Sequence, residues 1–165
     1  MGTEATPLLE ELGHHLLPVD PRSVSGAAAI DLAPRPESVR QARDFTRRTL
    51  HAWRLSEQFD AVALVVSELV TNALRHGLGR RTLDWGHGTG PMRTDLELEL
   101  MCSTTRLVCA VRDPSESEPR PARADSAAES GRGLHLVECF SDDWGWRRLS
   151  GKGRGKIVWA TFLTG

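Results

Sequence analysis

The sequence of 165 residues lacks any run of about 20 apolar residues, the length that a membrane-spanning helix needs. It also lacks a basic segment followed by an apolar core near its start, so we expect no signal peptide and no membrane association. An excess of positive charge is missing too, because the net charge is −1, and a global attraction for nucleic acid is therefore not expected. These absences predict a cytoplasmic protein without direct binding to nucleic acid.

Cysteine is scarce, and no two cysteines form a CxxC pair. Cys102, Cys109 and Cys139 all have apolar neighbours, so we expect reduced thiols in the core and not a disulfide framework. His14 and His15 are adjacent, but no further ligand has suitable spacing, so this pair does not predict a metal site.

The strongest pattern in the chain is one helix over residues 61–77. Its apolar residues recur at the spacing of three and four that is typical of a helix with one buried side, at Val62, Val65, Val66, Leu69, Val70 and Ala73. Asp60 is the expected N-cap, and Gly77 is the expected stop at the C-terminal end.

Three polar residues of this helix, Glu68, Asn72 and His76, are each four positions apart. Each step of four advances about 40° around the axis, so the three form one stripe at the rim of the apolar side. A carboxylate and an amide at the edge of a core need partners, because unpaired burial is costly. Either they cap or bridge to neighbouring segments, or they face a cation such as Mg²⁺ together with water and phosphates.

The rest of the chain predicts further strands and helices. We expect strands at 27–33, 95–100, 106–112, 142–148 and 156–163, and further helices at 37–53 and 131–140. Segment 95–100 alternates acidic residues with leucine, which predicts a strand with one buried face. This order predicts an α/β two-layer sandwich over residues 27–165, with a mostly antiparallel sheet covered by helices on one face, after an N-terminal extension at 1–26.

Two features in the second half accompany the helix. Asp113 ends a strand and precedes Pro114; it is either a turn-forming residue or an acceptor for an exocyclic amine placed away from the deep core. The other feature is a glycine box that opens the last helix, formed by Gly131, Arg132, Gly133 and Leu134. Glycines let a backbone approach an anion, and a helix N-terminus offers N–H groups with partial positive charge, so this box suits phosphate.

Segment 68–77 resembles the N-box of the GHKL ATPase superfamily, whose members have the Bergerat fold, and more closely that of RsbW-like anti-sigma factor kinases. The helix, the strand-ending aspartate and the glycine box occur in the family's order, so the resemblance covers about residues 30–163. It implies ATP and Mg²⁺ as cofactors. It assigns the orientation of the attacking group to Glu68, magnesium coordination to Asn72, and the phosphate side to His76 and the glycine box. Adenine recognition falls to Asp113.

The chain departs from this family at two places. The family often has glycines after the adenine-reading aspartate, whereas Asp113 is followed by Pro114, Ser115 and Glu116. The family's last strand often carries a threonine after its glycine, whereas here Lys156 follows Gly155. Lys156 either contacts phosphate or faces solvent.

The resemblance implies two functions from different classes. The first is a serine/threonine-protein kinase that phosphorylates an anti-anti-sigma-type partner. The second is a catalytically inactive, ATP-dependent binding module that regulates by protein–protein interaction, for example by sequestering a sigma factor, and the missing glycines after Asp113 keep it open. The resemblance also leaves a homodimer open. A detached histidine-kinase domain is disfavoured, because the sequence shows no helix pair with an acceptor histidine.

Overall fold

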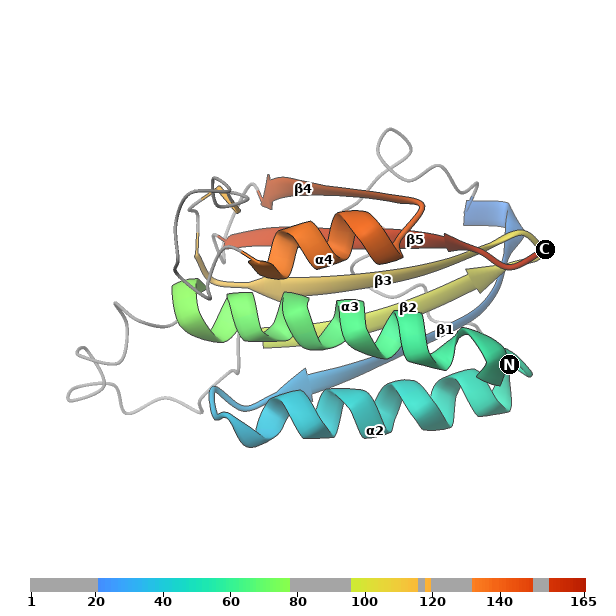
Figure 1. Cartoon of the computed structure of the whole chain (residues 1–165), viewed down its shortest axis with the longest axis horizontal. Helices are drawn as coiled ribbons and strands as arrows, with labels where there is room; N and C mark the ends of the chain where they lie inside the picture. The colour runs from blue at the N-terminus through green and yellow to red at the C-terminus, as the bar shows by residue number, and fades with distance from the viewer. Residues whose placement is uncertain (1–20, 78–95, 116–117, 120–131, 150–154) are drawn as a thin grey trace.

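The computed structural model describes residues 21–77, 96–115, 118–119, 132–149 and 155–165. Within these residues a five-stranded sheet forms one layer and three α-helices form the second, all on the same face of the sheet (Figure 1). In chain order the elements are η1 (Pro21–Ser23), β1 (Val24–Leu32), α2 (Glu37–Ala52), η2 (Ser56–Gln58), α3 (Phe59–Asn72), η3 (Ala73–Gly77), β2 (Leu96–Ser103), β3 (Arg106–Asp113), α4 (Arg132–Phe140), β4 (Asp143–Leu149) and β5 (Gly155–Leu163). The predicted two-layer sandwich is confirmed.

The sheet is antiparallel throughout, with the strand order β1-β2-β3-β5-β4. The expected strands are all present, although β1 begins at Val24, three residues before its predicted start. The register sets Asp113, the last residue of β3, opposite Lys156, the second residue of β5. Two strand ends that are far apart in sequence therefore meet at the same end of the sheet.

Helix α3 lies between α2 and α4 over the sheet (Figure 1). Its apolar stripe is buried as the spacing predicts, and residues such as Val62, Val66 and Leu69 join the main core with the inward side of the strands. The predicted N-cap is wrong, because α3 begins at Phe59, so Asp60 lies inside its first turn and the N-cap position belongs to Gln58. A 3₁₀ turn leads directly into the helix, and this turn replaces a side-chain cap.

The face of the sheet opposite the helices is buried over β2, β3 and β5, whereas β1 exposes residues such as Ala27 and Ala29 there. It carries a second apolar cluster made of Met101, Val108, Ala110, Leu149, Ile157 and Trp159. Glu99 pairs with Ala110 across the strands, so it shares this face, and its side chain is 0 % exposed. The prediction of one exposed face for this strand is therefore wrong, because alternation identifies the polar side of a strand but not whether solvent reaches it.

All three cysteines are free thiols, as predicted, but only two of them are in the core. Cys102 and Cys109 are buried, whereas Cys139 is exposed on α4, where its sulfur lies 3.7 Å from Nε2 of His135. The buried residues of α4 are Leu134 and Val137, so position 139 falls on the other side of the helix. An apolar neighbourhood in sequence does not show on which side of a short helix a residue lies.

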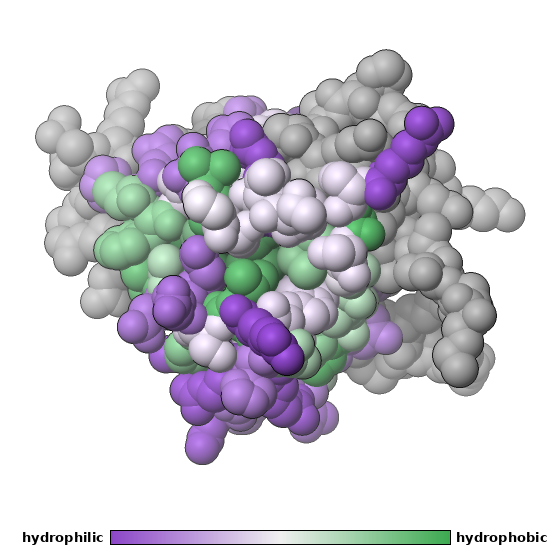
Figure 2. All heavy atoms as spheres, turned by 90° about the vertical axis from the view of Figure 1, so that its right-hand side faces the viewer, coloured by the Kyte–Doolittle hydropathy of each residue, from purple (hydrophilic) through white to green (hydrophobic). Residues whose placement is uncertain are grey.

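No helix among the described residues is long and apolar enough to cross a membrane. Figure 2 shows the end of the molecule at the right of Figure 1, where polar and apolar side chains are mixed. The large apolar residues with the greatest exposure are Phe140, which ends α4, and Leu163, which ends β5. Residues 1–20 of the expected N-terminal extension lie outside the described residues.

Candidate functional site

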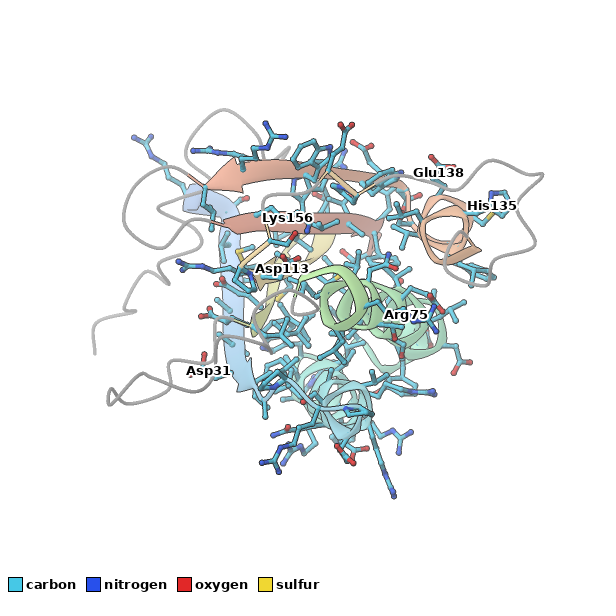
Figure 3. All side chains as sticks on the ribbon, turned by 90° about the vertical axis from the view of Figure 1, so that its left-hand side faces the viewer. Asp31, Arg75, Asp113, His135, Glu138 and Lys156 are labelled. Carbon is cyan, nitrogen blue, oxygen red and sulfur yellow. The ribbon has the colours of Figure 1, made fainter. Side chains whose placement is uncertain are left out.

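Four elements bring the predicted site residues to one end of the molecule. The C-terminal end of α3, the N-terminal end of α4, the end of β3 and the start of β5 all lie at the left in Figure 1. Figure 3 views this end directly and shows the side chains of Asp113 and Lys156 beside the end of α3. Features that are spread from residue 68 to residue 156 of the sequence therefore lie at the same end of the fold.

Glu68 and Asn72 lie in the last two turns of α3, and both side chains are half-buried. This position matches the predicted stripe at the rim of the apolar side. Among the described residues, neither side chain has a hydrogen bond or an ion pair, so the bridge to a neighbouring segment is not seen there. A carboxylate and a carboxamide one turn apart in this part of the helix offer oxygen ligands and hydrogen-bond acceptors.

Beyond Asn72 the helix continues as one widened π-helical turn, η3, from Ala73 to Gly77. Such turns inside α-helices often occur at functional sites. His76 lies in this turn, but its side chain falls outside the described residues, so its role along the phosphates stays a prediction.

The glycine box meets the structure at the start of α4. Gly131 lies outside the described residues, and α4 begins at Arg132, followed by Gly133 and Leu134. Leu134 is 3 % exposed and so anchors the first turn of the helix to the core. The first N–H groups of a helix have no partner within it, and the helix dipole makes this end favourable for an anion.

Asp113 is more deeply buried than its position before a proline suggested. Its side chain is 2 % exposed, and Oδ1 accepts hydrogen bonds from Nζ of Lys156 at 3.1 Å and from the backbone N–H of Ser115 at 2.8 Å. The expectation that this carboxylate avoids deep burial is wrong, and the charge is tolerated because an ammonium lies beside it. Lys156 is 4 % exposed, so it does not face solvent.

Gly155 holds the two strand ends together. A Cβ atom at this position would lie 2.2 Å from the carbonyl oxygen of Asp113 and 3.1 Å from Cα of Pro114. Only a residue without a side chain allows β5 to approach the end of β3 this closely.

Comparison with known proteins agrees with this fold. The sequence profile of the histidine kinase-like ATPase domain matches residues 32–162, which is most of the chain. The chain belongs to the histidine kinase-like ATPase family. No protein with a curated description matches the sequence.

Solved structures resemble this ATPase domain in fold. One of them is a chain from the crystal structure of the SiaB–SiaC complex of Pseudomonas aeruginosa, with a TM-score of 0.52 and 14 % identity. The alignment covers 85 % of the present chain and 91 % of the other. At this identity the likeness concerns the fold alone.

The oxygen ligands that this ATPase domain offers are suited to a metal ion that binds together with the phosphates of a nucleotide. Within the described residues, no group of three or more His, Cys, Asp or Glu side chains could hold a metal ion. Mg²⁺ is usually bound by one or two protein oxygens together with substrate phosphates and water, and the carboxamide oxygen of Asn72 is of the right kind for this arrangement.

The sequence did not reveal the pairing between Lys156 and Asp113. Part of the signal for this pairing is in the sequence, because the chain has only two lysines and one of them, Lys156, directly follows the glycine that opens the last strand. Only the register between β3 and β5 shows that this lysine faces the aspartate.

Proposed function

We propose that this ATPase domain is a regulatory protein kinase that transfers the γ-phosphoryl group of ATP to a serine of a partner protein. The observation that carries the proposal is the pair formed by Glu68 and Asn72 near the end of α3. Both polar side chains are half-buried, and neither has a partner among the described residues. The end of β3 and the start of α4 lie at the same end of the molecule. Phosphoryl transfer needs mainly positioning and neutralisation of charge, which these elements can supply.

Each part of the site has one task in this reaction. Asn72 would hold magnesium, which neutralises phosphate charge, and the N–H groups at the start of α4 would receive phosphate oxygens. Asp113 would accept a hydrogen bond from the 6-amino group of adenine. Glu68 would accept the proton of the serine hydroxyl while the serine oxygen bonds to the γ-phosphorus of ATP. The bond between this phosphorus and the oxygen that bridges it to the β-phosphate breaks at the same time, and ADP leaves.

The identity of the partner rests on the resemblance to RsbW-like anti-sigma factor kinases. This resemblance implies that the substrate is an anti-anti-sigma-type protein, and that a sigma factor is a second protein that the domain sequesters. The structure with a similar fold comes from a complex of two proteins, which supports a function exercised on a protein.

The first test of the proposal is magnesium-dependent binding of ATP to the full chain, measured by isothermal titration calorimetry. We expect Asn72→Ala to weaken Mg²⁺-dependent ATP binding about tenfold or more, which corresponds to ~1.4 kcal/mol. Thr71→Ala is the matched control, because Thr71 is its half-buried neighbour on the same helical turn and should leave binding unchanged. Equal affinity for both variants would mean that Asn72 does not hold the metal.

The second test separates the kinase from the binding module. The chain is incubated with radiolabelled ATP and a partner recovered by pull-down, and phosphate on the partner is measured. We expect label on a partner serine, and we expect Glu68→Gln to abolish transfer while ATP affinity changes by less than about threefold. ATP binding without any transfer by the unaltered chain would leave the ATP-dependent binding module as the function.

A further inference from the structure

The buried ion pair between Asp113 and Lys156 is the most unusual polar feature of the described residues. The two residues face each other at the ends of β3 and β5, and their side chains are 2 % and 5 % exposed. Both project to the side of the sheet that carries the helices, because Val111 and Val158, two positions away on the same strands, belong to the main core. The pair therefore lies at the inner edge of the candidate site.

Lys156 brings more hydrogen-bonding capacity to this position than the protein uses. An ammonium group has three N–H donors, and among the described residues Asp113 is the only partner of Nζ. A buried charge is costly unless it is paired and fully hydrogen-bonded. An acceptor supplied by a ligand beside Asp113 would reduce this cost.

The position of the pair is fixed by the backbone. The approach of Gly155 to the carbonyl group of Asp113 holds β5 against the end of β3, and Ser115 N–H donates to the same carboxylate oxygen as Lys156. The carboxylate and the ammonium are thus held side by side, as an acceptor next to a donor. A fixed order of acceptor and donor can distinguish ligands that present the opposite order.

We propose that Lys156 determines the base specificity of the nucleotide site by donating a hydrogen bond to N1 of adenine while Asp113 accepts one from the 6-amino group. Adenine presents a donor at position 6 beside an acceptor at N1, which complements this pair. Guanine presents an acceptor at position 6 and a donor at N1. Its acceptor would therefore face the carboxylate of Asp113, and its donor would face the ammonium of Lys156. This inference rests on the proposed function, because it requires that Asp113 is in contact with the base.

The test compares ATP with 1-deaza-ATP, in which a C–H group replaces N1, by calorimetric titration of the unaltered full chain with Mg²⁺. We expect 1-deaza-ATP to bind about tenfold more weakly than ATP or worse, because a hydrogen bond to a charged donor is lost inside the site. The matched control is 7-deaza-ATP, which keeps N1 and the 6-amino group and should bind within about threefold of ATP. Equal affinity for ATP and 1-deaza-ATP would overturn the inference and leave the proposed function intact.

A variant assigns the effect to Lys156. In Lys156→Met, ATP should bind more weakly and the ratio between ATP and 1-deaza-ATP should fall to within about threefold, since the donor is absent. A ratio that stays at tenfold would mean that another group reads N1. If the variant does not fold, the comparison of analogues on the unaltered chain still decides. No binding of ATP by that chain would overturn the proposed function together with this inference.

Discussion

Gly155 is the residue whose replacement should have the largest effect near the site. A Cβ atom 2.2 Å from the carbonyl oxygen of Asp113 can be accommodated only by moving the backbone of β3 or β5. We expect Gly155→Ala to lower the free energy of unfolding by about 2 to 3 kcal/mol, in the range of overpacked core substitutions. For a chain of this size the melting temperature should fall by roughly 5 to 10 °C in differential scanning calorimetry.

Gly165→Ala is the matched control for this prediction, because a Cβ atom at Gly165 has nothing within 4 Å. It should leave the melting temperature unchanged within about 1 °C. If Gly155→Ala were as stable as this control, the close approach of the two strand ends would not exist in solution.

The site was predictable from the sequence where it depends on local spacing, and not where it depends on pairing between distant segments. Helical periodicity placed Glu68 and Asn72 on one side of α3, and the proline after Asp113 marked the end of β3. The partner of Asp113 lies 43 positions further along the chain, and the strand register that joins them has no local signature. The functions of these residues remain predictions.

The C-terminal end of α2 shows how one element is stopped without a glycine. Arg54 follows the helix with a φ angle of 59°. Its backbone N–H donates a hydrogen bond to the carbonyl oxygen of His51, and the N–H of Leu55 donates one to the carbonyl oxygen of Leu50. This hydrogen-bond pattern is a Schellman motif, which usually has glycine at the position of Arg54. The left-handed conformation is costly for a residue with a Cβ atom.

We therefore expect Arg54→Gly to stabilise the protein. The gain from relieving the left-handed residue exceeds the extra entropy of glycine in the unfolded chain, and the net increase in the free energy of unfolding should be about 0.5 to 1 kcal/mol. Urea denaturation measures it. Arg54→Ala is the control, since alanine keeps the Cβ atom and should bring no gain. A variant with alanine as stable as the one with glycine would mean that backbone strain is absent.

At the scale of elements, the sequence predicted the order and type of the helices and strands because each has its own periodicity. It failed where burial depends on what other parts of the molecule cover. The alternation in β2 predicted one exposed face, yet Glu99 is fully buried opposite the helices, and the apolar setting of Cys139 predicted burial, yet that side chain is exposed.

The whole molecule determines the ionisation of Cys109, which lies in the middle strand of the sheet, β3. Its side chain is fully buried, and loss of solvation on burial raises the pKa of the thiol from 9.0 to about 12. Below pH 9 the thiol is protonated in both the folded and the unfolded chain, so it adds no pH dependence. Between pH 9 and 12 only the unfolded chain releases this proton, so the free energy of unfolding decreases as the pH rises.

This linkage predicts a difference between the unaltered chain and Cys109→Ala in urea denaturation at pH 8 and pH 10. Over this interval the unaltered chain should lose about 1.4 kcal/mol more than the variant, because only the unaltered chain releases the Cys109 proton on unfolding. Comparing slopes with pH removes the constant cost of the small cavity that alanine leaves. Cys139→Ala is the control, since it removes an exposed thiol and should follow the unaltered chain. If Cys109→Ala showed the same pH dependence as the unaltered chain, water would reach the middle of the sheet before the molecule unfolds, and the core between β3 and the helices would be open in solution.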